Sequence, residues 1–148
     1  MVRNKVIEII SALLVLLFVY AAISKLLDYS TFKFQLGRSP YINGMAGTVA
    51  WALPVAELAI AGLLIIKTTR LIGLYASFFL MLLFSGYIYA MLHFSYYIPC
   101  SCGGILSYMS WEQHFIFNVV FTILPAIAVL LYKQQQASPE KKESPQYI

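Results

Sequence analysis

The sequence predicts an all-α membrane protein, a four-helix transmembrane bundle with both termini in the cytoplasm. Of its 148 residues, 61% are hydrophobic and only 11% are charged, whereas a soluble domain usually carries about 25% charged residues. Four apolar runs are each close to the roughly 20 residues that a spanning helix needs. We expect residues 1–133 to form a single four-helix transmembrane domain in contact with the lipid bilayer.

The expected helices cover residues 6–27, 48–66, 71–92 and 113–132. The first run follows basic residues as a signal peptide would, but it is too long for a signal core and lacks a cleavage site, so we expect a retained helix. Residues 28–47 and 93–112 are the expected outer loops, and the first of these should lie at the membrane surface. The tail at 134–148 combines a Gln run with Ser-Pro pairs, which predicts a disordered cytoplasmic segment.

Basic residues set the expected orientation, because cytoplasmic loops carry an excess of Lys and Arg. With the amino terminus inside, seven basic residues are cytoplasmic, and Lys25, Lys33 and Arg38 are on the outer side. We therefore expect a multi-pass protein of the bacterial inner membrane with residues 93–112 in the periplasm. The net charge of +4 forms no basic stripe, which argues against nucleic-acid binding.

The segment Pro99-Cys100-Ser101-Cys102-Gly103-Gly104 holds both cysteines of the chain. A disulfide between Cys100 and Cys102 would close a very small loop, so it would stabilise the fold little. Strain in so tight a ring makes the disulfide easier to reduce. The motif therefore favours thiol–disulfide exchange, which makes the chain a candidate thiol–disulfide oxidoreductase. Two buried thiols without chemistry are the plain alternative.

Histidines near the cysteines leave a metal hypothesis open. Thiolates and imidazoles suit Cu(I) or zinc, and His93 and His114 flank the Cys-Ser-Cys loop. The spacing matches no established zinc pattern, so we assign no metal ligands, but a copper- or zinc-handling membrane protein remains an alternative. A non-catalytic subunit of a membrane redox complex is another.

The start of the fourth expected helix supplies the supporting residues. Ser110 and Gln113 have the spacing of a capping box, and His114 follows within the first turn. His114, Asn118 and Thr122 recur every four residues, so they share one face, which should turn into the bundle. An imidazole near the cysteines can favour the thiolate or relay a proton; a structural hydrogen bond to the loop is the alternative.

Two further features lie within the second and third expected helices. Glu57 is an acid in the middle of a span. An ionisable residue there is either functional or structural, as a neutral carboxylic acid or as an acid paired with a tyrosine or basic group that clasps the helices. The third helix has a stripe that includes Tyr89 and His93. Such a stripe can line a quinone pocket, with Tyr89, His93 and His114 as candidate contacts, although packing is its commoner role. Gly86 and Ala90 form a small-xxx-small pair that admits a neighbouring helix.

Two motifs follow each other in the second half of the chain: Pro-Cys-Ser-Cys-Gly-Gly and then Ser-Trp-Glu-Gln-His-x-x-x-Asn. With these motifs and its four expected helices, the chain resembles the MauE/DoxX-like redox-associated membrane proteins, which are common in Bacteroidetes. The similarity covers roughly residues 5–132, and Cys100, Cys102, Trp111, His114 and Asn118 carry its specific part. The resemblance implies a DoxX-like four-helix bundle. It also implies a role in making or maintaining disulfides in periplasmic proteins, as ascribed to MauE for methylamine dehydrogenase. A periplasmic thioredoxin-like protein or a disulfide-containing substrate protein would then be the partner. Two electron routes are open: a quinone between the helix ends, by analogy with other four-helix disulfide-generating membrane proteins, or a second periplasmic protein.

Overall fold

The computed structural model describes residues 2–37, 43–94 and 110–137, and every element in these ranges is helical. Four long helices are apolar and long enough to cross a membrane: α1 (Val2–Leu27), α3 (Ala46–Ile65), α4 (Arg70–Phe94) and α5 (Trp111–Ala137). The expected all-α membrane fold is therefore confirmed. Two short elements, α2 (Tyr29–Gly37) and η1 (Asn43–Met45), lie between α1 and α3.

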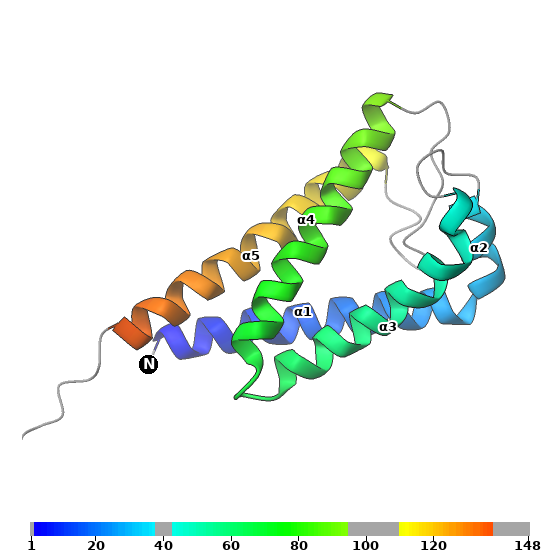
Figure 1. The fold of residues 1–148 in the computed structure, drawn as a ribbon. Helices are drawn as coiled ribbons and strands as arrows, with labels where there is room; N and C mark the ends of the chain where they lie inside the picture. The colour runs from blue at the N-terminus through cyan, green and yellow to red at the C-terminus, as the bar shows by residue number, and fades with distance from the viewer. Residues whose placement is uncertain (1, 38–42, 95–109, 138–148) are drawn as a thin grey trace, which may run out of the picture.

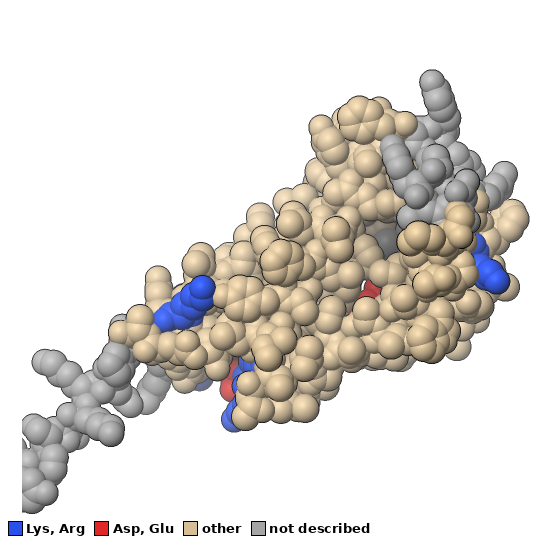
Figure 2. All heavy atoms as spheres, viewed as in Figure 1, with Lys and Arg blue, Asp and Glu red and all other residues tan. Residues whose placement is uncertain are grey.

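The four long helices form a closed ring in which each packs against its two neighbours, in the order α1, α3, α4, α5 (Figure 1). Both ends of the described chain lie at the same end of the bundle, where Gln135 donates a hydrogen bond to Asn4. At the opposite end the α1–α3 pair diverges from the α4–α5 pair, and α2 packs against α3. Tan, uncharged surface covers most of the face in Figure 2, as lipid contact requires.

In the short turn between α3 and α4, side chains donate hydrogen bonds to carbonyls of the last turn of α3. The Thr69 hydroxyl donates to the Leu63 carbonyl at 2.9 Å, and the Arg70 Nε donates to the Leu64 carbonyl at 3.1 Å. Carbonyls at a helix end have no partner within the helix, so these bonds end α3 and start α4. The two helices approach closely at Gly73, where an added Cβ would lie 3.0 Å from the Leu64 nitrogen.

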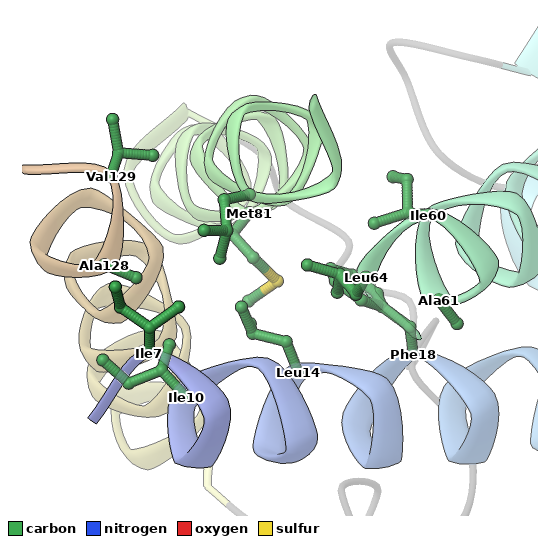
Figure 3. Close-up of a cluster of buried hydrophobic side chains, with 11 residues drawn as sticks. Ile7, Ile10, Leu14, Phe18, Ile60, Ala61, Leu64, Met81, Ala128 and Val129 are labelled. Carbon is green, nitrogen blue, oxygen red and sulfur yellow. The ribbon is translucent and has the colours of Figure 1, made fainter. Parts of the chain in front are cut away.

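The core is built from one apolar face of each long helix. Met81 of α4 extends across the bundle toward Leu14 of α1, with Phe18 and Leu64 beside them (Figure 3). These four side chains are each at most 2% exposed. A second, smaller cluster joins Phe32 of α2 to Ala50 of α3, which shows that the expected surface segment is partly a packed helix.

The observed helices are longer than predicted at several ends. Helix α1 begins at Val2, and α5 continues to Ala137. Residues 134–137, which we expected to be disordered, are thus helical; Gln and Ala are good helix formers, and Gln135 is held by Asn4. The remainder of the tail, 138–148, lies outside the described residues.

Candidate functional site

A buried ion pair joins the first two spanning helices. The Lys25 Nζ of α1 donates to the Glu57 Oε1 of α3 at 2.8 Å, and the two side chains are 4% and 0% exposed. Of the two alternatives for Glu57, the structure provides the basic partner that clasps the helices. The expected orientation places Lys25 among the outer charges, whereas the structure buries its side chain in the interior of the bundle.

The spacing of residues along α1, which can be read in the sequence, explains why Lys25 is buried. Leu14, Phe18, Ala21 and Lys25 follow one another at steps of four, three and four residues, and all are buried. Such steps keep side chains on one helix face. A lysine in register with a buried apolar stripe needs an acid opposite it, and Glu57 was the available one.

The predicted polar face of α5 does turn into the bundle. His114 and Asn118 are each 4% exposed, and Thr122 is 8% exposed. The Thr122 hydroxyl donates to the Asn118 carbonyl at 2.7 Å and lies 3.2 Å from the hydroxyl of Ser85 on α4. Part of this face therefore links α4 to α5, while His114 and Asn118 are left for other contacts.

The amino-terminal end of α5 is fixed by the predicted capping box. The Gln113 amide N–H donates to the Ser110 hydroxyl at 3.2 Å, and the Ser110 amide N–H donates to the Gln113 side chain at the same distance. Two backbone donors at the helix start are thus satisfied reciprocally. The Trp111 ring stacks on the His114 ring with centroids 5.7 Å apart, so the capped turn also orients the imidazole.

Lys25, Glu57, His114 and Asn118 line one small cavity between α1, α3, α4 and α5. Its volume is about 20 Å³, which is room for roughly one water molecule. Three buried polar atoms of these cavity-lining residues have no hydrogen-bond partner in the described part of the chain: Glu57 Oε2, His114 Nε2 and Asn118 Nδ2. Such atoms are costly to bury alone, so this cluster is suited to hold a small hydrogen-bonding species or a proton.

A larger, apolar cavity of about 360 Å³ lies beside this cluster, between α2, α3 and α4. Among the described residues that line it, one is charged, Lys25. The others are apolar or aromatic: Phe32, Leu36, Val49, Leu53, Leu80, Leu83, Phe84, Tyr87 and Ile88. Ligand pockets in proteins commonly measure about 300–1,000 Å³ and are lined in this way, with a few polar groups. Lys25 and Phe84 line both cavities.

The aromatic stripe of α4 does not face this cavity. Tyr89 is 50% exposed, Phe79 is 60% exposed and His93 is exposed as well. The Tyr89 and His93 rings contact each other at 4.5 Å on the outside of the helix. The buried face of α4 instead carries smaller or flexible residues such as Ser77 and Met81, so Tyr89 and His93 face away from the interior of the bundle.

Gly86 lies on the same outward side, and an added Cβ there would meet nothing within 4 Å. The expected helix approach at Gly86 and Ala90 is therefore not found in the described bundle. The close approach occurs at Gly73 instead. Large side chains were easier to recognise in the sequence than the small ones that bring helices together.

Cys100 and Cys102 lie outside the described residues, so their pairing stays a prediction. Within the described ranges no group of three or more metal-ligating side chains gathers. His114 is buried in α5, while His93 is exposed at the end of α4.

Comparison of the sequence with known proteins identifies one family. Neither the curated proteins nor the solved structures contain a match to the chain. One family model matches residues 3–132, which include α3, α4, the Cys-Ser-Cys segment and most of α1 and α5. On this match the chain belongs to the family of the methylamine utilisation protein MauE.

Proposed function

We propose that the chain is a membrane thiol–disulfide redox protein whose Cys100–Cys102 pair exchanges disulfides with a periplasmic thioredoxin-like or substrate protein. The observation that carries the proposal is the Cys-Ser-Cys spacing, whose ring is too small to brace a fold. Membership of the MauE family supports a redox context. In the exchange, a partner thiolate attacks the Cys100–Cys102 disulfide, and a mixed disulfide forms.

The balance of electrons then requires an acceptor. The partner's second thiolate resolves the mixed disulfide, which leaves the partner oxidised and Cys100 and Cys102 as two thiols. A membrane quinone takes two electrons and two protons from this dithiol, which becomes a disulfide again as the quinone becomes a quinol. The spanning helices hold no cysteine, so electrons cannot cross the bilayer by a chain of thiols within this protein.

Geometry near the motif supports a proton-handling role for His114. Seven residues separate Cys102 from Ser110, which caps α5, and His114 follows within the first turn. Its Nε2 is buried without a partner among the described residues, in the same cavity as Glu57. We propose that this imidazole moves protons between the cysteine side and the interior cluster, with Trp111 and Asn118 holding its position.

Charge distribution supports a periplasmic cysteine segment. Five basic residues lie toward the end of the bundle that holds both ends of the described chain: Arg3, Lys5, Lys67, Arg70 and Lys133. Since Lys25 is interior, Lys33 is the one described cation near the other end. By the positive-inside rule the first end is cytoplasmic, so residues 95–109 would be periplasmic, with the protein in the inner membrane.

The test is to trap the mixed disulfide. In the host, Cys100→Ser and Cys102→Ser are made singly, and one of them should accumulate a covalent adduct with a periplasmic protein that disappears on reduction. The double variant is the control and should form none. If neither single variant forms an adduct, the exchange proposal is wrong.

Two matched variants extend this test. His114→Gln should slow adduct formation at least about 10-fold if it assists proton transfer, whereas His93→Gln, on the exposed end of α4, should not.

A membrane-impermeant maleimide should label Cys102 of the Cys100→Ser variant in intact spheroplasts. It should label Lys67→Cys, in the cysteine-free background, only after permeabilisation. The opposite labelling pattern would refute the orientation.

A further inference from the structure

The 360 Å³ cavity between α2, α3 and α4 has the chemistry of a binding site for a neutral carbonyl compound. Its walls are apolar or aromatic apart from Lys25, whose Nζ lies 5.8 Å from the ring centroids of both Phe32 and Phe84. Lys25 lines this cavity and is only 4% exposed, so its ammonium is shielded from bulk solvent.

The ammonium has spare donors. A lysine ammonium carries three N–H groups, and within the described residues Lys25 donates to Glu57 Oε1 alone. A ligand with a carbonyl oxygen at its inner end could therefore accept a hydrogen bond from Lys25. A planar ring would pack between the aromatic walls, and offset stacking of this kind adds to the gain from apolar burial.

The charge balance selects a neutral ligand over an anion. Glu57 already compensates the charge of Lys25 at 2.8 Å. A carboxylate in the cavity would place a second negative charge beside the pair, and desolvating it would be costly. A neutral carbonyl accepts the hydrogen bond without this cost.

We propose that this cavity binds the ring of a membrane quinone, with one ring carbonyl accepting a hydrogen bond from Lys25. The choice of quinone among neutral carbonyl compounds rests on the proposed redox function. Lys25 also lines the small cavity that contains His114 and Glu57. The ring would therefore lie next to the interior cluster proposed above to handle protons. This site differs from the outward stripe of Tyr89 and His93 considered from the sequence.

The experiment measures binding of a short-tailed ubiquinone to the purified full-length protein in nanodiscs by calorimetry. Val49→Trp fills the cavity, whereas Val55→Trp adds the same group on the same helix at an exposed position that does not line it. Val49→Trp should raise the Kd at least about 10-fold, and Val55→Trp should change it less than about 2-fold. If both variants bind as the wild type does, or both lose binding equally, the assignment is wrong.

Further arms test the chemistry and separate the two proposals. Lys25→Met combined with Glu57→Leu removes the donor without leaving a lone charge, and it should weaken binding by a similar factor; unchanged binding would overturn the role of Lys25. Oleate should not displace the quinone, and displacement would identify a lipid carboxylate site instead. The Cys100→Ser, Cys102→Ser variant should still bind quinone. If quinone binds but no mixed disulfide is trapped, the quinone site is supported and the exchange proposal is rejected. If a mixed disulfide is trapped but quinone does not bind, the exchange is supported and the quinone site is rejected.

Discussion

The Lys25–Glu57 pair should reveal itself as strong coupling between two substitutions. The charged atoms lie 2.8 Å apart, and the side chains are 4% and 0% exposed, so each charge has lost nearly all its solvent. Removing one partner of such a pair typically costs about 3–5 kcal/mol, because the other charge stays buried and uncompensated. We therefore expect Glu57→Leu or Lys25→Met alone to lower the free energy of unfolding by about that amount.

The double variant should behave differently, because it leaves no lone charge. Replacing both members of a buried ion pair by apolar residues is often neutral or stabilising, so Lys25→Met with Glu57→Leu should lie close to the wild type. The resulting coupling energy should exceed the roughly 1.7 kcal/mol reached by ordinary interhelical hydrogen bonds in membranes. That threshold distinguishes an ion pair from a simple polar contact.

The assay is denaturant unfolding in bicelles, followed by helical circular dichroism, for the wild type, both single variants and the double variant. Glu8→Leu is the matched control, since Glu8 is exposed on α1 and surface changes usually stay within about 0.5 kcal/mol. If the two single effects simply add in the double variant, the pair does not hold α1 to α3, and the reasoning fails.

Two further predictions concern packing and capping. Gly73→Ala should destabilise the bundle by about 1–3 kcal/mol, because the new Cβ would lie 3.0 Å from the α3 backbone. The control Gly86→Ala has open space around it and should leave the stability equal or slightly higher. Equal losses of stability in the two variants would contradict the close approach at Gly73. Ser110→Ala should lower the free energy of unfolding by about 1 kcal/mol and speed amide hydrogen exchange in the first turn of α5. Gln113→Glu keeps the capping box and should keep the exchange slow. Unchanged exchange in Ser110→Ala would show that the cap does not hold this turn.

The spanning helices were predictable because hydrophobic length is a local property. Twenty apolar residues specify a span without any knowledge of neighbours, and a capping box needs only the spacing of Ser110 and Gln113. The inward face of His114 and Asn118 was predictable for the same reason, since helical periodicity in a bilayer turns polar groups inward.

The site itself depended on contacts between helices, which periodicity alone does not give. Lys25 and Glu57 are 32 residues apart, and only packing of α1 on α3 brings them together. Tyr89 and His93 face outward because aromatic side chains suit the lipid face of a membrane helix as well as its core face. The buried face of α4 is marked instead by two small polar residues, Ser77 and Ser85, which a membrane helix turns inward. Gly73 carried no pattern that separates it from other glycines.

The ion pair also bears on how the chain enters the membrane. An unpaired acid near the middle of a span, where Glu57 lies in α3, disfavours insertion by about 2.5–3.5 kcal/mol. Lys25 and Glu57 belong to the first two spans in chain order, α1 and α3, so they can neutralise each other as soon as that hairpin has been synthesised. The first half of the protein can thus settle in the bilayer as a unit before α4 and α5 leave the ribosome.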